Sequence, residues 1–332
     1  SLTQPTLSAN ITQATLTVTG LTGDNKVYSA TTGATATGTP TLSGVIGSDS
    51  VTIGGTPTYT FASANVGTGI SISTTGFTIS GASSDNYSLT QPTLSANITQ
   101  ATLTATVSGT TTKVYTGTTA ATIVTSNITF VGLKGSQNFT FNNATLAGTY
   151  NNANVASASS VTGSIASSDV TGTNGGLTSN YIFPATVTGT GAISAAPLVI
   201  TPVNAVRPFG ATNPTFTATY SGLVNGETSS VVSGLVLTSP SVISSAVGNY
   251  AISGSSASAA NYSISYVEGV LTVAGAVALT DPNPSSGDGF GTVTQYLTNG
   301  NVVVTAPYDD AGGTNAGAVY LFNSTTGALI ST

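Results

Sequence analysis

The side chains best suited to bind a ligand lie in a short stretch rich in Asp, Asn and Ser. Asp281, Asn283 and Ser285 place oxygen atoms at alternating positions, and Asp288 follows. Calcium loops use this spacing because alternate side chains can converge on one ion. The stretch lacks the glycine at the sixth position and the glutamate at the twelfth of such a loop. A Pro/Gly/Asp turn between domains is therefore our main interpretation, with calcium as the alternative.

Other catalytic and metal chemistry is restricted by composition. The chain has no His and no Cys, which excludes Ser-His-Asp and Cys-His pairs and the usual zinc and iron sites. A Ser–Lys dyad would need one of three lysines beside a serine in a cleft, and a carboxylate pair would have to come from ten scattered acids. We expect no enzyme, no catalytic residues, no cofactor-binding residues and no metal ligands, with calcium as the single open possibility.

Two lysines stand in a repeated motif, Lys26-Val27-Tyr28 and Lys113-Val114-Tyr115. Some extracellular domains of immunoglobulin-like fold form an isopeptide bond between a lysine and an asparagine, and either lysine could supply the amine. The simpler interpretation is a solvated lysine beside a core tyrosine. Loss of ammonia from the intact mass would distinguish the two.

The charge pattern excludes several partners. The net charge is −6, and the four basic residues, Lys26, Lys113, Lys134 and Arg207, are far apart in the sequence. No stretch could neutralise a row of phosphates, so we expect no nucleic-acid partner. There is no polybasic segment for an anionic membrane, and no apolar run is long enough for a membrane span. Because the chain contains no Met, we expect it to be a piece of something longer.

The elements that would position these residues are predicted to be strands. Only 4% of residues are charged but 39% are hydrophobic, mostly Val, Ile, Leu, Ala and Tyr among Thr, Gly and Asn. These residue types are typical of strands and turns, and good helix formers are scarce. Alternation in Thr15–Thr19, Phe77–Ser80 and Tyr262–Tyr266 is typical of half-buried strands. We expect an all-β chain with almost no helix.

The sequence also repeats itself. Seventeen residues, SLTQPTLSANITQATLT, occupy 1–17 and return unchanged at 88–104, an offset of 87 that the Lys-Val-Tyr motif shares. Asn-Tyr pairs at Asn86-Tyr87, Asn180-Tyr181 and Asn261-Tyr262 recur near the expected ends of modules. A period of roughly 80 to 95 residues is too long for a solenoid and predicts tandem β-sandwich modules, each with a small core.

The first two modules resemble the YDG-type repeats of large bacterial surface adhesins. Residues 26–35 and 113–122 are similar to the opening signature of that family, and 64–69 and 85–89 are similar to its later segments. The aspartate of the family motif is missing in both copies, where Ser29 and Thr116 replace it. The resemblance implies extracellular repeat domains.

Residues 196–274 resemble the related MBG repeats of the YGX type. The matching pieces are residues 208–214, 220–227, 247–252 and 261–273. Phe209 stands where tyrosine is usual in that family, which keeps an aromatic anchor.

The tail differs from the modules before it. Gly289-Phe-Gly291, residues 301–307 and residues 317–322 are similar to one FG-GAP repeat, a propeller blade of the integrin-α type. Such blades can carry a calcium loop, but the corresponding segment, Thr298–Asn301, has no carboxylate. A propeller needs about four to eight blades, so we expect this one to belong to a longer array.

Five segments are predicted on these grounds. They are a closing strand of a preceding module with a linker (1–13), a first YDG-like module (14–99), a second (100–195), an MBG-like module (196–275) and a single FG-GAP-like blade (276–332). The fold class is tandem immunoglobulin-like or β-grasp-like β-sandwich modules in an elongated array, followed by a blade-like segment.

Three functions are compatible with this organisation. The first is a non-catalytic stalk or fibre region of a large secreted bacterial cell-surface adhesin, which contacts neighbouring modules or copies of itself. The second is a subunit of a self-assembling extracellular filament or sheath, in which the opening residues are a strand donated to a neighbour. The third is an adhesin segment that binds a host or cell-surface glycan or protein, with tyrosines as a stacking patch. We expect the tyrosines to be core residues.

Overall fold

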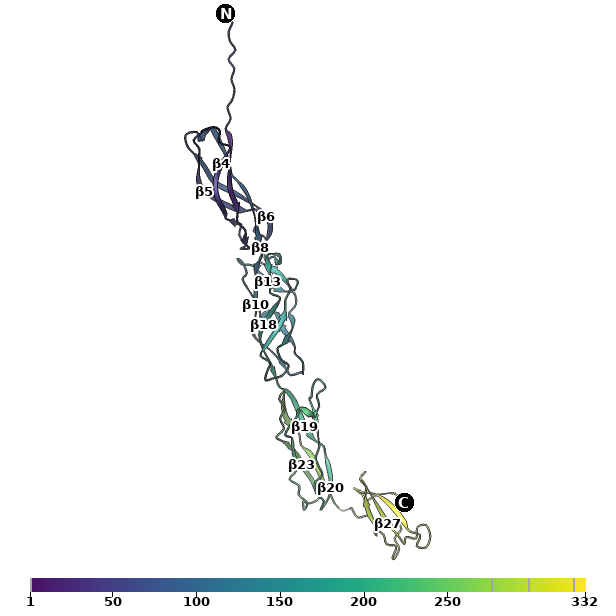
Figure 1. The fold of residues 1–332 in the computed structure, drawn as a ribbon. Coiled ribbons are helices and arrows are strands. Elements are labelled where there is room, and N and C mark those ends of the chain that lie inside the picture. The colour runs from purple at the N-terminus through teal and green to yellow at the C-terminus, as the bar shows by residue number, and fades with distance from the viewer. Residues whose placement is uncertain (1, 276, 298, 325) are drawn as a thin grey trace. The chain divides into compact units, whose positions relative to one another are not determined.

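The computed structural model describes residues 2–275, 277–297, 299–324 and 326–332 (Figure 1). The first residue of the expected closing strand (Ser1), the first residue of the expected blade (Ala276) and Thr298 of the blade loop lie outside the described residues. Two compact units are distinguished, and each is described by itself. One comprises 1–113 and 118–193, and the other comprises 114–117 and 194–332. For convenience, the first, second and third modules are residues 14–99, 100–195 and 196–275.

The prediction of an all-β fold is confirmed. Among the described residues there is no α-helix, and helical structure is confined to five three-residue 3₁₀ turns. Two of these turns, Ser84–Asn86 and Thr178–Asn180, end on the Asn of an Asn-Tyr pair. β-branched residues favour the pleated strand, and Gly and Asn supply the turns between strands.

The first module is built of two sheets. Its strands are β1 (Ala14–Gly23), β2 (Lys26–Val27), β3 (Gly33–Ala34), β4 (Ala36–Ser43), β5 (Thr52–Phe61), β6 (Gly67–Ser80), β7 (Tyr87–Thr90) and β8 (Thr93–Thr99). One sheet has the order β4-β1-β7 and the other the order β2-β8-β6-β5-β3. Alternation of side chains places Leu16 and Val18 inside the module.

The second module has one large sheet and two short pairs. Its strands are β9 (Ala101–Thr102), β10 (Thr104–Val114), β11 (Ala120–Val124), β12 (Ile128–Val131), β13 (Asn138–Phe141), β14 (Thr145–Tyr150), β15 (Ser160–Ser164), β16 (Val170–Thr173), β17 (Tyr181–Ile182) and β18 (Thr186–Ser194). The large sheet has the order β11-β14-β15-β18-β10-β12, and β13-β16 and β17-β9 form the pairs.

The third module again has two sheets. Its strands are β19 (Ala196–Pro202), β20 (Ala205–Pro208), β21 (Ala218–Ser221), β22 (Val236–Thr238), β23 (Gly248–Ser255), β24 (Tyr262–Tyr266) and β25 (Gly269–Ala274). The sheet orders are β21-β19-β24 and β20-β25-β23-β22. The segment after it forms one antiparallel sheet, β26 (Thr294–Tyr296), β27 (Asn301–Ala306), β28 (Ala318–Asn323) and β29 (Leu329–Ser331), as expected for a four-stranded propeller blade.

A parallel strand pair gives the Asn-Tyr motif the same place in all three modules. The strand that begins with this tyrosine lies parallel to the opening strand of its own module. Tyr87 pairs with Ala14, Tyr181 with Ala101, and Tyr262 with Ala196. The motif therefore marks the start of the strand that holds the module's first strand in place, and the tyrosine lies at one end of the module.

A second repeated pairing fixes the opposite end of each module. The backbone N–H of Tyr28 donates to Thr99 O at 2.8 Å, that of Tyr115 to Ser194 O at 2.8 Å, and that of Phe209 to Ala274 O at 2.9 Å. Each acceptor belongs to the end of the module's last strand. The three modules therefore each carry an aromatic residue at an equivalent tip.

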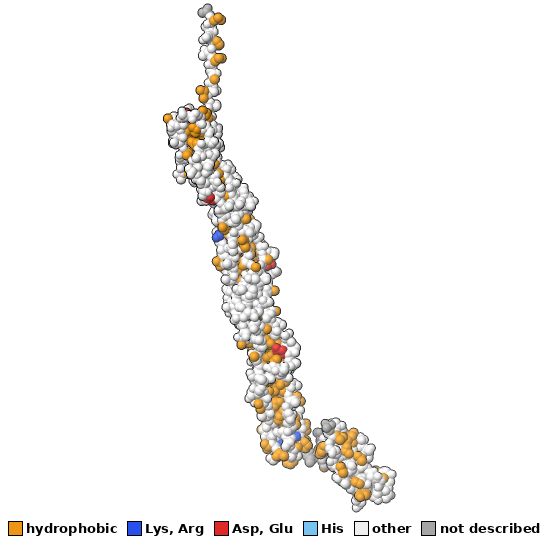
Figure 2. All heavy atoms as spheres, in the orientation of Figure 1, with side chains coloured by type: hydrophobic (Ala, Val, Ile, Leu, Met, Phe, Trp, Pro, Cys, Tyr) orange, Lys and Arg blue, Asp and Glu red, His pale blue; other side chains and the backbone are white. Residues whose placement is uncertain are grey.

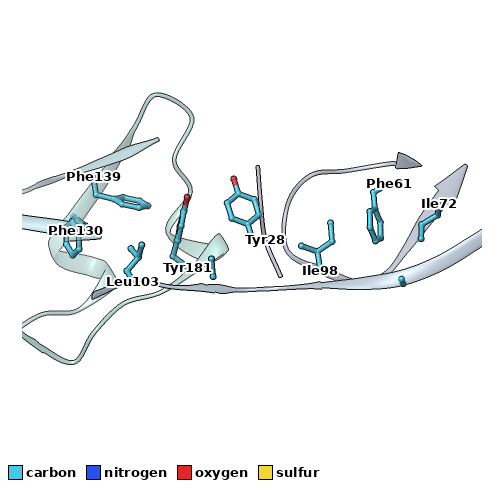
Figure 3. Close-up of a cluster of buried hydrophobic side chains, with 11 residues drawn as sticks. Tyr28, Phe61, Ile72, Ile98, Leu103, Phe130, Phe139 and Tyr181 are labelled. Carbon is cyan, nitrogen blue, oxygen red and sulfur yellow. The ribbon is translucent and has the colours of Figure 1, made fainter. Parts of the chain in front are cut away.

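The cores of the first two modules are continuous. One buried cluster runs from Phe61, Ile72 and Ile98 through Tyr28 to Tyr181 and on to Leu103, Phe130 and Phe139 (Figure 3). Leu16 and Val18 of the first module and Ile123, Val161 and Val187 of the second are buried outside this cluster, so each module also has core residues of its own, and the cluster joins the two modules at their junction. The physical reason is that the aromatic tip of the first module packs against the second module instead of ending in solvent.

The surface carries few charges. Figure 2 shows charged side chains as isolated spots on the visible face, with apolar side chains along the N-terminal segment. No helix in the described part of the chain is long and apolar enough to cross a membrane.

Candidate functional site

The most distinctive site is a repeated aromatic junction, built on a loop that occurs three times. The loops are Gly44–Asp49, Gly132–Gln137 and Gly222–Glu227, each opening with glycine and ending on a carboxylate or carboxamide. The opening glycines have φ of 103°, 102° and 108°. An added Cβ there would lie 2.8 Å or less from the backbone oxygen of Thr15, Thr102 or Pro197, all in or beside the opening strands. Only glycine allows the loop to lie this close to the module's first strand.

The first junction joins Tyr28 of the first module to Tyr181 of the second (Figure 3). The rings meet edge to face with centroids 5.3 Å apart, and both side chains are 2% exposed. Gln137 lies between the hydroxyl groups. It accepts a hydrogen bond from the Tyr181 hydroxyl at 2.6 Å and donates one to the Tyr28 hydroxyl at 2.7 Å. The N–H of Lys134 donates to the Tyr181 hydroxyl at 3.0 Å, so every polar group at this apolar contact is paired.

Asparagine from the Asn-Tyr pair closes one edge of this junction. Asn180 is 1% exposed and donates from Nδ2 to Asn65 Oδ1 at 3.0 Å. Its own Oδ1 accepts the N–H of Val66 at 3.0 Å. Both partners belong to the first module, so the dipeptide contributes one residue to the apolar contact and one to its polar rim.

The second junction, within 114–117 and 194–332, repeats this arrangement with a carboxylate. Tyr115 and Tyr262 meet edge to face with centroids 5.5 Å apart. The Tyr115 hydroxyl donates to Glu227 Oε1 at 2.6 Å, and the Tyr262 hydroxyl donates to Glu227 Oε2. The N–H of Val224 donates to the Tyr262 hydroxyl at 3.1 Å. Two tyrosines therefore share the two oxygens of one acid.

The comparisons with known proteins agree with the repeated arrangement. The YDG domain family matches residues 12–94 and 99–189, which together are more than half of the chain. The chain belongs to the YDG domain family. The MBG domain family of the YGX type matches residues 198–272, and the FG-GAP repeat matches residues 276–322. No curated protein and no solved structure matches the chain.

The three Asn-Tyr tyrosines at the module ends are core residues, as predicted, whereas Tyr266 of the MBG module is 38% exposed. Tyr87, Tyr181 and Tyr262, all from Asn-Tyr pairs, are 4%, 2% and 8% exposed. Such burial does not suit a patch for stacking sugars, which requires an exposed ring face. The sequence prediction was correct about burial but did not identify the second tyrosine of each junction as the partner.

The glutamate of the second junction affects the ionisation of its tyrosine. The hydrogen bond to Glu227, followed by burial, raises the pKa of Tyr115 to about 12. Burial, followed by the same acid, raises the pKa of Tyr262. Because the raised pKa belongs to the folded state, neutral Tyr115 contributes stability that is fully present below about pH 10 and is lost as pH rises through about 12.

We expect Glu227→Gln to lower the pKa of Tyr115. Glutamine keeps a hydrogen-bond acceptor, as Gln137 does in the first junction, but removes the negative charge that disfavours a tyrosinate. A tyrosinate absorbance titration of the full chain, recorded for the original protein and the variant, would measure this shift. Identical titration curves would show that Glu227 does not control the tyrosine.

The lysines of the Lys-Val-Tyr motif hold the loop that follows it. Lys26 Nζ donates to Thr31 O at 2.6 Å and Gly33 O at 2.8 Å, and it lies 5.3 Å from the centre of the Phe61 ring. Lys113 Nζ makes the same pair of backbone contacts, at 2.6 and 2.9 Å. The lysine beside a core tyrosine is confirmed, and its ammonium group binds carbonyl oxygens of the loop. These contacts give the lysine of the motif a structural role, and the isopeptide bond stays a prediction that the intact mass would test.

In the MBG module Arg207 takes the place of that lysine, two residues before the aromatic tip. It is 2% exposed. Its Nε donates to Asn213 Oδ1 at 2.7 Å, and its Nη2 donates to Ser241 Oγ at 2.7 Å and Val242 O at 2.5 Å. The guanidinium group therefore ties two irregular segments to β20.

Two of the four candidate calcium ligands, Asp281 and Asp288, are brought together in the FG-GAP segment, where Asp309 joins them. Carboxylate oxygens of Asp281, Asp288 and Asp309 lie within 4.8 Å of one another. Asp309 is fully buried and accepts hydrogen bonds from Asn283 Nδ2 at 3.0 Å and the Tyr320 hydroxyl at 2.5 Å. These bonds lower the pKa of Asp309. Asp309 could not be identified from the sequence because it is distant from the other two aspartates, after the Ala-Pro motif.

The remaining contacts of this acidic cluster are those of a turn. Asp281 Oδ1 accepts the N–H of Asn283 at 3.0 Å, and Asp288 accepts the N–H groups of Ser285 at 2.9 Å and Phe290 at 3.2 Å. The two backbone bonds lower the pKa of Asp288. The cluster offers oxygen ligands of the kind calcium prefers, and its hydrogen bonds also fit the Pro/Gly/Asp turn expected from the sequence.

Proposed function

We propose that the chain is a non-catalytic structural region, a stalk or fibre, of a large secreted bacterial cell-surface adhesin. Its mechanism is mechanical: successive modules resist bending relative to one another and hold a functional region away from the cell. The observation that carries the proposal is the shared core at the first junction, where Tyr28 and Tyr181 belong to one buried cluster. A linker between independent domains would contain few buried apolar contacts.

Other observations support an extracellular role. The matched families are repeat-type domains. The chain has few charges and no Cys, so it can fold outside the cell without disulfide formation. Three of its four basic residues bind backbone carbonyl oxygens within the chain. We propose that its partners are neighbouring modules rather than a soluble substrate.

A surface-display experiment tests the stalk. The chain is placed between a bacterial outer-surface anchor and a peptide epitope, and immunogold electron microscopy measures the distance of the epitope from the cell. We expect a narrow distribution at large distance, compared with a short, broad one for a Gly/Ser linker of equal length. Matching distributions would overturn the proposal.

A filament subunit is the second candidate, favoured by the N-terminal segment. Leu7 and Ile11 are 90% and 101% exposed, whereas Ile98, the counterpart of Ile11 in the repeated sequence, is 1% exposed in β8. Such a segment has the composition of a strand that completes a sheet elsewhere. Concentration-dependent assembly of the purified chain, abolished by deletion of residues 1–13, would support the filament. Assembly that survives this deletion would exclude strand donation.

A further inference from the structure

The N-terminal end of the first module carries half of an aromatic junction. The Tyr87 hydroxyl donates to Asp49 Oδ2 at 2.7 Å and accepts the N–H of Ile46 at 3.0 Å. The equivalent tyrosines, Tyr181 and Tyr262, make the same two contacts with their own loops. The loop, the acceptor and the buried tyrosine are therefore present at this end too.

The difference lies in exposure. Ile46 is 63% exposed and Asp49 is also exposed. The residues that correspond to Asp49, Gln137 and Glu227, are partly buried, because a tyrosine from the tip of another module covers each of them. A hollow of about 460 Å³ lies here, between this loop, Tyr87 and residues 11–14.

We propose that Ile46, Asp49 and Tyr87 form a surface that accepts the tip tyrosine of another YDG module. Residues 2–12 are the last strand of that module. The incoming hydroxyl donates to the Asp49 carboxylate, as Tyr115 does to Glu227. This inference rests on the proposed stalk function and assigns residues to one of its contacts.

The neighbouring segment identifies the occupant. Residues 2–12 are identical to residues 89–99, whose β8 portion pairs with β6 and β2 of a YDG module. Residue 99 in turn accepts the backbone N–H of the tip tyrosine, Tyr28. In a module whose last strand is residues 2–12, the backbone N–H of the tip tyrosine would therefore bind residue 12. This places the tip tyrosine beside the hollow, which Thr12 and Gln13 help to line.

The repeated sequence allows a direct test with the full chain. Placing a copy of residues 14–87 before Ser1 encodes one additional complete module, because residues 1–12 then occupy the place of residues 88–99. We expect amide hydrogen exchange in residues 2–12 to slow at least 100-fold relative to the original chain. Unchanged exchange would overturn the proposal, whether the added module fails to fold or folds without this strand.

A double-mutant cycle then tests the tyrosine contact itself. It combines Asp49→Ala with Tyr→Phe at the added copy of Tyr28, a change that keeps the ring and removes the hydroxyl. We expect the two changes to be coupled by about tenfold in the unfolding equilibrium constant of the extended chain. Asp49→Ala in the original chain corrects for the loss of the Tyr87 contact. Additive effects would refute docking on Asp49 but would leave the stalk proposal, tested by surface display, unaffected.

Discussion

Replacing Tyr28 with alanine is expected to destabilise the first and second modules together, by about 4 kcal/mol. Truncation of a buried aromatic side chain typically costs about 3–5 kcal/mol, and an edge-to-face pair adds about 0.5–1.5 kcal/mol. Tyr28 is 2% exposed and contacts Tyr181 across the junction. Urea denaturation of the full chain would give the loss of stability, and amide exchange in β8 and β17 would show whether both modules lose protection.

Two matched variants separate the contribution of the Tyr28 ring to stability from the contributions of its hydroxyl group and of strand β2. Tyr28→Phe removes only the hydrogen bonds to Gln137 and should cost about 1 kcal/mol. Val27→Ala changes the neighbouring residue of β2, which is 57% exposed, and should cost about 0.5 kcal/mol or less. A loss confined to the first module would show that the shared cluster does not couple the two modules.

Replacing Arg207 with alanine is expected to have the next largest effect, about 3 kcal/mol on the third module. The guanidinium group is 2% exposed and donates to Asn213, Ser241 and Val242. Its loss removes charge-assisted bonds and leaves the buried Ser241 hydroxyl without this donor, and an unpaired buried polar group costs about 1–3 kcal/mol. Urea denaturation monitored by amide exchange in β20 and β25 would measure the loss.

Arg207→Lys provides the informative comparison, because lysine occupies this position in the YDG modules. We expect it to restore part of the stability, since an ammonium group can reach one or two of these oxygens but cannot form the planar fork. Lys134→Ala is the control for a change of charge alone, because Lys134 joins its junction through the backbone N–H. An Arg207→Ala variant as stable as Lys134→Ala would contradict this role.

Much of the fold could be predicted because its signals are local. The strands can be predicted from β-branched residues and from the alternation of apolar and polar side chains. The period of the modules can be predicted from the unchanged sequence at 1–17 and 88–104. The junction could not be predicted in the same way. Tyr28 and Gln137 are 109 residues apart, and no local pattern in either segment specifies their contact.

The burial of Arg207 could not be predicted from the sequence either. Arginine is almost never fully buried unless it is paired, and the partners of Arg207 include Ser241 and Val242, which lie in an irregular segment. Alignment of the three modules on their aromatic tips would have placed Arg207 beside Lys26 and Lys113. Alignment of the three loops on their opening glycines would have aligned Asp49, Gln137 and Glu227, each five residues after its glycine.

The central claim is that the first two modules move as one body because they share a core. The chain has no Cys, so Ser71→Cys and Thr129→Cys would give two defined sites for spin labels, both exposed and one in each module. Double electron–electron resonance then measures the distribution of distances between the labels. We predict one narrow distribution that broadens when Tyr28→Ala is added. A broad distribution in the labelled chain, or one that Tyr28→Ala leaves unchanged, would contradict the account.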